Sequence, residues 1–432
     1  MKSATKLVTD TLTNTLTTSH PNQTNSNHEY HVGTVEQYEL DQPVEVELGQ
    51  VKAVVIRTRS GIYALGNKCT HYGAPLNKSV VKNDRIKCPW HGACFHIATG
   101  DIEDAPACDP LPTYNIRIDN NNIYITAEQT DDNINSKRKL HTAIEQHHIQ
   151  PVRLGNPDDN IVIVGGGAGS VGAVESLRSI GYIGCITVIS NESRLPYDRT
   201  KLSKSPDVDK TKIELRSQQF YDEQQIKFIF NTTVTNIDTD QCIIHTNTNQ
   251  SIPYHKLLIC TGGSAMKLGV PGDDSNNIFT VRNPSDADAI INTIKSIAQC
   301  RVVVVGSGFI GMEIGAFLQK QKLDNKLDIS SVTNINMGAR PFEAVLGQQI
   351  GDEIMSWHTS LGIKFITNSK TTKFNSSSNN NVCGVDVVYH DGTTDTIAAD
   401  VVIIGAGVKL NTSFLQDNSS FQLEKKWCCN SE

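Results

Sequence analysis

The chain has 432 residues, of which 38% are hydrophobic, so it is long enough for two to four domains that each bury a core. Its net charge of -7 at pH 7 comes without a long lysine or arginine run, which excludes the usual electrostatic basis for binding nucleic acid or an anionic membrane. No apolar run reaches the roughly 18 residues of a membrane-spanning helix. Eleven scattered cysteines without a secretory signal favour a reducing compartment inside the cell, the cytoplasm or the mitochondrion, over a disulfide framework.

The first part of the chain divides into a polar tail and a region of short strands. Residues 1–28 are rich in threonine, asparagine and serine, and they are either a disordered tail or a mitochondrial presequence that lacks arginine. Short β-type segments separated by turn residues follow, and they predict an all-β domain over residues 29–128. Residues 129–158 are polar and charged, which indicates a linker with one short helix around residues 141–148.

The rest of the chain predicts α/β structure. From Asn160 onward, apolar strands alternate with helical patterns, which is typical of parallel α/β units. Two units begin alike, with "NIVIVGGGAGSVGAVESLRSIG" from residue 160 and "RVVVVGSGFIGMEIGAFLQ" from residue 301. The likeness indicates two nucleotide-binding domains of one design. The expected fold is therefore multidomain, with Rossmann-like α/β domains behind the all-β domain.

Four residues in two loops have the spacing of iron ligands. Cys69 and His71 lie in "CTHYGAPL". After sixteen intervening residues, Cys88 and His91 lie in "CPWHGACF". Two thiolates on one iron and two imidazoles on the other define a Rieske [2Fe-2S] centre. A Cys2His2 zinc site needs the same ligand types, but its usual spacing pairs like with like, whereas each loop here supplies one cysteine and one histidine.

The second α/β unit carries a complete dinucleotide fingerprint. Gly306, Gly308 and Gly311 match GxGxxG directly after a run of β-branched residues and at the start of a helical pattern. The first glycine permits a tight turn, the second lets the backbone approach the pyrophosphate, and the helix N-terminus stabilises the phosphate charge. The next strand ends in Asn336 without a carboxylate, and Arg340 follows. An arginine there can accept a 2′-phosphate, so the choice between NADH and NADPH stays open.

The first α/β unit departs from the fingerprint at one position. Gly165 and Gly167 fit, and Ser170, a small residue, stands where the third glycine would pack the helix on the strand. A frame that begins at Gly167 also matches the letters, but it starts two residues past the strand. Glu192 follows the segment "CITVIS" and is the acid expected on the ribose hydroxyls.

The wider pattern resembles a known family of flavoprotein reductases with the glutathione-reductase fold. The resemblance rests on "LPYDRTKLSK" at 195–204, "LLICTGG" at 257–263, "GSGFIGMEIG" at 306–315 and "ADVVIIGAGV" at 399–408. It is strongest for the branch of apoptosis-inducing factor and the dioxygenase ferredoxin reductases. The N-terminal domain resembles Rieske ferredoxins through "CTH" and "CPWHG". Together they are similar to the Rieske-bearing apoptosis-inducing-factor-like group, which favours the mitochondrion.

The resemblance implies which cofactor each α/β domain binds and where each domain ends. In the family, the first fingerprint binds FAD, the second binds NAD(H) or NADP(H), and the NAD(P) domain is inserted into the FAD domain. Carried over, this gives an FAD-binding domain of residues 159–280 and 396–420, and an NAD(P)-binding domain of residues 281–395. The family's chain continues to a Gly-Asp motif and a C-terminal interface domain, so this chain is expected to be truncated before both.

The resemblance also implies residue roles around the flavin. Arg199 would contact the flavin side of FAD, and Lys204 would approach the flavin N5 edge, where a cation stabilises reduced flavin. Glu313 would pair with that lysine as the second catalytic residue. Thr261 and Gly262 would belong to the FAD site.

The function implied is an NAD(P)H-dependent FAD oxidoreductase that passes electrons to a fused Rieske centre. Flavin is needed because it takes an electron pair and releases single electrons. A redox-sensing signalling protein like apoptosis-inducing factor, or an inactive truncated chain, is the alternative. The sequence leaves open the oligomeric state and the electron acceptor, a protein or a small molecule.

Overall fold

The structure, a computed structural model, describes residues 27–128, 153–416, 418 and 420–421. The chain divides into two compact units, of which the first ends at Pro151 and the second starts at Val152. The helix expected around residues 141–148 and almost all of the expected tail lie outside the described residues.

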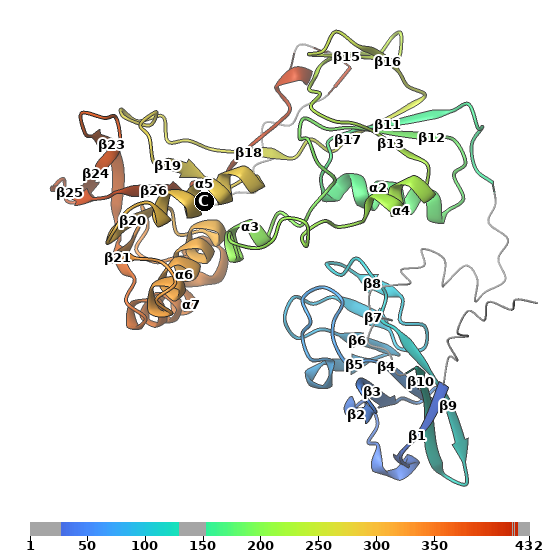
Figure 1. The fold of residues 1–432 in the computed structure, drawn as a ribbon. Coiled ribbons are helices and arrows are strands. Elements are labelled where there is room, and N and C mark those ends of the chain that lie inside the picture. The colour runs from blue at the N-terminus through green and yellow to red at the C-terminus, as the bar shows by residue number, and fades with distance from the viewer. Residues whose placement is uncertain (1–26, 129–152, 417, 419, 422–432) are drawn as a thin grey trace, which may run out of the picture. The chain divides into compact units, whose positions relative to one another are not determined.

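The first unit is an all-β domain of two antiparallel sheets, as predicted (Figure 1). One sheet has the strand order β1-β10-β9-β4-β3-β2, and the other has the order β5-β6-β7-β8. The strands of the larger sheet are β1 (Asn27–Thr34), β2 (Val44–Leu48), β3 (Val51–Arg57), β4 (Ile62–Gly66), β9 (Thr113–Asp119) and β10 (Asn122–Glu128). Those of the smaller sheet are β5 (Val80–Lys82), β6 (Arg85–Lys87), β7 (Cys94–His96) and β8 (Ile102–Asp104).

Strand β3 separates two hydrophobic cores. Its Ala53 and Val55 pack in a core with β1, β2 and β10, whereas its Val54 and Ile56 pack in a second core with Cys69 and the smaller sheet. This division follows from the alternation of side chains across a strand, with a period of two residues. One face of β3 therefore supports the segment that carries the predicted iron ligands.

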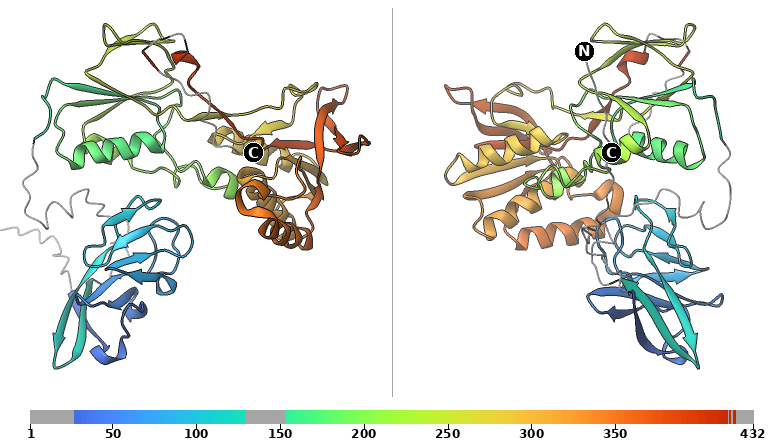
Figure 2. Two further views of the ribbon diagram at one scale, coloured as in Figure 1. Left: turned by 180° about the vertical axis from the view of Figure 1, so that it is seen from behind. Right: turned by 45° about the vertical axis from the view of Figure 1, so that its right-hand side comes forward.

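The second unit begins with a four-stranded parallel sheet in the order β13-β12-β11-β17. Helices α2 and α4 pack on one face against Ile163, and the antiparallel strands β14 to β16 cover Val162 and Val164 on the other (Figure 2). Burial on both faces explains the continuous apolar runs in the sequence. The elements are β11 (Asn160–Val164), α2 (Ala168–Ser179), β12 (Cys185–Ile189), α3 (Lys201–Lys204), α4 (Gln218–Glu223), β13 (Ile226–Ile229), β14 (Val234–Asp238), β15 (Ile243–Thr246), β16 (Ser251–Pro253) and β17 (Lys256–Ile259).

A five-stranded parallel sheet follows, in the order β19-β26-β20-β21-β22. Helices α5 and α6 pack against Val302 and Val304 on one face, and β23 to β25 pack against Val303 and Val305 on the other. The elements are β19 (Ile278–Thr280), α5 (Pro284–Lys295), β20 (Cys300–Val305), α6 (Phe309–Leu323), β21 (Ile329–Ile335), α7 (Glu343–Ser360), β22 (Lys364–Ile366), β23 (Ser369–Ser376), β24 (Val382–Tyr389), β25 (Thr394–Ala398) and β26 (Val401–Ile404).

The return of the chain differs from the expected boundary. Residues 396–420 were expected in the first α/β domain, but β26 lies in the second sheet, paired with β19 and β20. All four residues of β26 are buried, which suits a strand with neighbours on both sides and cover on both faces. The chain leaves this sheet only at β27 (Val408–Leu410), which pairs with β18 (Gly263–Ala265).

Candidate iron-sulfur and dinucleotide sites

The two ligand loops of the β domain have the same backbone hydrogen bonds. The N–H of Cys69 donates to the carbonyl of Ala74 at 2.9 Å, and the N–H of Gly73 donates back to Cys69 at 2.8 Å. In the second loop the N–H of Cys88 donates to Ala93 at 2.8 Å, and the N–H of Gly92 donates back to Cys88 at 3.1 Å. Both glycines have a positive φ, 72° and 77°, which permits the turn. The loops are thus two copies of one turn, with a cysteine at the start of each.

The four predicted ligands lie in these loops as two neighbouring pairs, one of cysteines and one of histidines. Among the described residues, no three His, Cys, Asp or Glu side chains are grouped closely enough to hold a single metal ion. The thiols of Cys69 and Cys88 are buried, with 2% and 4% of each residue exposed. Burial raises the pKa of the Cys69 thiol to about 11; the backbone N–H of His71 opposes this rise, and the Cys88 thiol beside it adds to it. The rings of His71 and His91 lie 4.8 Å apart between centroids, nearly perpendicular. Two adjacent thiols and two adjacent imidazoles fit a [2Fe-2S] cluster with one kind of ligand on each iron.

The second glycine fingerprint has space where a pyrophosphate would lie. A Cβ on Gly306 would lie 2.5 Å from the carbonyl O of Gly405, and one on Gly311 would lie 2.1 Å from that of Gly306, so both glycines are needed for close packing. A Cβ on Gly308 would meet no described atom within 4 Å, although Gly308 is the N-cap of α6. The strand, turn and helix are therefore arranged as the fingerprint requires, with an open helix N-terminus for the phosphates.

The first fingerprint repeats this arrangement. A Cβ on Gly165 would lie 2.2 Å from the carbonyl O of Cys260, whereas one on Gly167 would meet nothing within 4 Å. Ser170 is 1% exposed, and its hydroxyl donates to the carbonyl O of Gly167 at 2.7 Å, so this small residue packs inside the turn. Strand β11 ends at Val164, directly before Gly165, which favours the frame that starts there.

Glu192, expected on the FAD ribose, lies in a network with Arg199. Arg199 Nη2 donates to Glu192 Oε1 at 2.7 Å, and the Tyr197 hydroxyl donates to Glu192 Oε2 at 2.8 Å. Arg199 also donates to the carbonyl O of Arg282 at 2.6 Å. The structure thus brings Glu192 and Arg199 together, a contact that the sequence pattern does not predict. Their roles toward FAD stay predictions.

Thr261 and Gly262 follow strand β17 at the base of the first fold. The side-chain amide of Asn411 donates to the carbonyl O of Thr261 at 3.1 Å, and the backbone N–H of Asn411 donates to that of Gly262 at 3.0 Å. The return of the chain after β27 is therefore fixed to the end of β17. The FAD contacts of Thr261 and Gly262 also stay predictions.

The contact predicted between Lys204 and Glu313 is present. Lys204, at the end of α3, places Nζ 2.9 Å from Oε1 of Glu313 on α6. The hydroxyl of Ser203 donates to the other carboxylate oxygen at 2.5 Å. Sequence reasoning missed Ser203, because only the turn of α3 brings its hydroxyl to the same carboxylate. The structure therefore holds a cation beside the helix that opens the second nucleotide fold.

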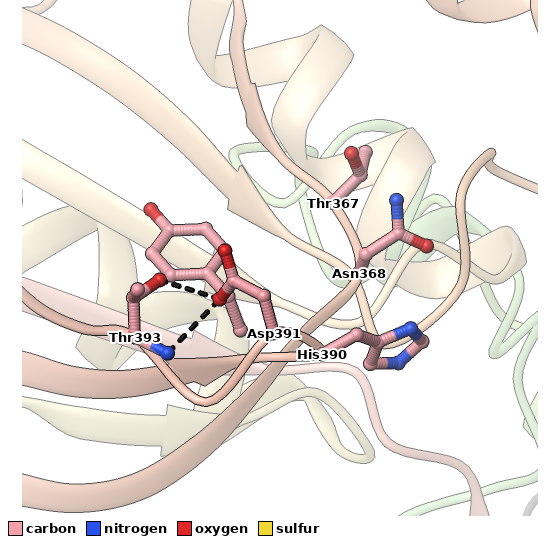
Figure 3. Close-up of a pocket in the computed structure, with 6 residues that line it drawn as sticks. Thr367, Asn368, His390, Asp391 and Thr393 are labelled. Atoms are coloured by element: carbon pink, nitrogen blue, oxygen red, sulfur yellow. Dashed lines mark hydrogen bonds between the residues drawn. The ribbon is translucent and has the colours of Figure 1, made fainter.

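A shallow pocket of about 660 Å³ lies at the end of β22 and holds none of the predicted site residues (Figure 3). The turn beside it is closed by Asp391, which accepts hydrogen bonds from the backbone N–H and the hydroxyl of Thr393. The backbone N–H of Asn368, which lines the pocket, donates to the carbonyl O of Gly338 at 2.9 Å. The pocket therefore adjoins the loop that follows β21.

A Rieske-type β domain followed by two tandem dinucleotide folds defines the class as a flavin oxidoreductase with its own iron-sulfur domain. Comparison with known proteins confirms this class. Residues 159–427 match the pyridine nucleotide-disulphide oxidoreductases, and residues 28–115 match the Rieske [2Fe-2S] domain. The chain belongs to the pyridine nucleotide-disulphide oxidoreductase family. That family implies FAD and NAD(P), and the Rieske domain implies a [2Fe-2S] cluster.

Individual relatives carry the same combination or part of it. Apoptosis-inducing factor 3 of Homo sapiens and that of Mus musculus are each 32% identical over 384 residues, which is 89% of this chain and 60% of theirs. Rhodocoxin reductase of Rhodococcus erythropolis is 30% identical over 255 residues, 58% of this chain and 56% of its own. The chain thus spans about 60% of the length of the curated relatives that match it over most of its residues.

Solved structures agree with the fold. The covalent putidaredoxin reductase-putidaredoxin complex has a TM-score of 0.55 and 28% identity, and it covers 60% of this chain and 61% of its own. The ferredoxin reductase for the CYP199A2 system from Rhodopseudomonas palustris has a TM-score of 0.54 and 25% identity over 60% of this chain and 61% of its own.

Among the described residues, no helix combines the length and apolarity needed to cross a membrane.

Proposed function

We propose that the protein oxidises NADH or NADPH through FAD and delivers the electrons to its own [2Fe-2S] cluster, from which an acceptor protein or small molecule takes them. The observation that carries the proposal is the ion pair of Lys204 and Glu313. Lys204 lies within the first dinucleotide fold, between β12 and β13, and Glu313 lies two residues beyond the last glycine of the second fingerprint. The pair therefore joins the first dinucleotide fold to the first turns of the helix that opens the second, and it fixes a positive charge there.

The chain's own residues account for binding and charge. The N-termini at Gly167 and Gly308 would receive the two pyrophosphates, because a Cβ on either glycine would meet no described atom within 4 Å. When bound, FAD accepts a hydride from the nicotinamide and releases single electrons, which the iron-sulfur cluster accepts. Lys204 would hold a positive charge at the flavin edge, and Glu313, which accepts a hydrogen bond from Ser203, would fix its position.

The test is an anaerobic titration of the purified full chain with NADH and, separately, with NADPH. The visible spectrum follows the flavin and cluster bands, and cytochrome c serves as acceptor in a second assay. We expect both bands to bleach and cytochrome c to be reduced, whereas Cys69→Ser should bleach only the flavin band. If the chain holds FAD and neither nucleotide reduces the flavin or any acceptor, the proposal fails. That result would favour a signalling role for nucleotide binding.

A further inference from the structure

The two dinucleotide folds can be aligned by their hydrogen bonds, without reference to sequence likeness. The N–H of Gly165 donates to the carbonyl O of Ile189 at 2.8 Å, and the N–H of Gly306 donates to that of Ile335 at 2.9 Å. Glu192, the third residue after Ile189, therefore corresponds to Gly338, the third residue after Ile335. The second fold thus has no side chain at the position where the first fold carries its ribose carboxylate.

A different carboxylate stands beside this position. Oε2 of Glu343 lies 3.7 Å from the place that a Cβ on Gly338 would take. Glu343 is the first residue of α7, in a single turn that ends at the non-helical Gly347. The loop that separates the two residues is fixed, because the side-chain amide of Asn336 donates to the carbonyl O of Gly338 at 3.0 Å and to that of Arg340 at 2.9 Å. The acid is therefore supplied from the helix instead of from the strand end.

The arginine of the same loop is already neutralised. Arg340 Nη1 lies 3.3 Å from Oε1 of Glu343, and Arg340 Nε donates to Oδ1 of Asp352 on α7. The Arg340 side chain is 26% exposed, so most of its surface lies away from solvent. Two carboxylates and one guanidinium leave a net negative charge. A 2′-phosphate, which carries a charge of about −2 at pH 7, would be repelled there, whereas a ribose diol would not.

We propose that Glu343 binds the adenosine ribose hydroxyls at the second dinucleotide site, and that the pairing of Arg340 with Glu343 and Asp352 makes this site selective for NADH over NADPH. The inference rests on the proposed function, because it assigns the second fingerprint to the nicotinamide nucleotide. It makes Glu343 and Asp352 specificity-determining residues. Glu343 accepts the hydroxyls, and Asp352 removes the cation that a 2′-phosphate would need.

The test uses two probes that differ only in the group at issue, 5′-AMP and adenosine 2′,5′-bisphosphate. Each is titrated calorimetrically into the full chain in the presence of excess FAD, so that the first dinucleotide site is filled. We expect 5′-AMP to bind about tenfold or more tightly than the bisphosphate. Asp352→Asn should release Arg340 and so reduce the preference for 5′-AMP over the bisphosphate. The double variant Glu343→Gln/Asp352→Asn should bind the bisphosphate more tightly than 5′-AMP.

Asp391→Asn is the matched control. It removes one carboxylate from the turn beside the pocket that adjoins the Gly338 loop, and this carboxylate bonds to Thr393 rather than to Arg340. The preference for 5′-AMP should be unchanged in this variant. A wild-type chain that binds the bisphosphate as tightly as 5′-AMP, or a Glu343→Gln variant with unaltered preference, would overturn the inference and leave the proposed function standing. Binding of neither probe would overturn the proposed function as well.

Discussion

Lys204 and Glu313 form an ion pair of 2.9 Å between the short helix α3 and the helix α6, which opens the second dinucleotide fold. Their side chains are 40% and 25% exposed, so solvent screens the attraction and the pair adds only about 0.2–1 kcal/mol to stability. The hydroxyl of Ser203 holds the same carboxylate from a second side. The pair is therefore better suited to position the ammonium group than to stabilise the fold.

Glu313→Gln should slow the reduction of the flavin by NADH about tenfold to hundredfold, because the amide no longer fixes the lysine charge at the flavin edge. As Glu313 is a positioning residue, the Kd for the nucleotide and the melting temperature should change little. Stopped-flow absorbance gives the rate, and calorimetry gives the Kd. Asp324→Asn breaks another ion pair of α6, that with Lys320, and serves as the control. Equal slowing in both variants would contradict the assignment.

Substitutions at two glycines of the second fingerprint should affect different properties, one nucleotide binding and the other stability. Gly308→Ala should fold normally, because its φ is −78° and a Cβ there meets nothing within 4 Å, but the methyl group should weaken nucleotide binding about tenfold or more. Gly311→Ala places a Cβ 2.1 Å from the carbonyl O of Gly306 and should lower the free energy of unfolding by about 1–3 kcal/mol. Chemical denaturation and nucleotide titration of both variants test this, and normal nucleotide affinity in Gly308→Ala would disprove it.

The sequence predicted those parts of the sites that are local in the chain. Each ligand loop carries a cysteine and a histidine within four residues, and each fingerprint runs from a strand to the adjacent helix. Such patterns can be recognised because a single turn determines the geometry. The Lys204–Glu313 contact was predicted only through the family resemblance, since no local pattern links residues on α3 and α6.

The sequence could not predict contacts that depend on packing between distant segments. Glu343 belongs to the site only because the loop after β21 folds back onto the start of α7. The predicted assignment of β26 to the first α/β domain was wrong for a similar reason. An all-apolar strand fits either parallel sheet, and the register with β20 decides between them.

The metal content should distinguish the iron-sulfur centre from a zinc site. Cys69→Ser should lose the cluster, with iron falling from about two atoms per chain to none and the visible cluster bands disappearing. Cys94→Ser is the matched control, because Cys94 is also buried in the same domain but is not a predicted ligand. It should retain the iron and the spectrum. Zinc instead of iron in the wild-type chain, or equal loss of iron in both variants, would refute the assignment.

Asp400 should make the free energy of unfolding depend on pH, because its carboxylate binds Arg301 next to the second fingerprint. Its carboxylate accepts hydrogen bonds from Arg301 Nε at 2.9 Å, Nη2 at 2.6 Å and the backbone N–H at 2.9 Å. These bonds join the start of β26 to β20, so they support the packing of Gly405 against Gly306. Hydrogen bonding by Arg301 lowers the pKa of Asp400 below its ordinary value of 3.8.

A carboxyl group whose pKa is lower in the folded state stabilises the fold above its unfolded pKa, and this stabilisation is lost as the pH falls through the folded pKa. Asp400→Asn should therefore reduce the free energy of unfolding at neutral pH by about 1–2 kcal/mol, a figure discounted for the partial exposure of the pair. The difference between wild type and variant should persist from about pH 7 to pH 5 and shrink below about pH 4, as the wild-type carboxylate takes up its proton. Denaturant unfolding of both proteins over this range measures it. If the difference in free energy of unfolding stayed constant into the acid range, the charge of the Asp400 carboxylate would contribute nothing to its contact with Arg301.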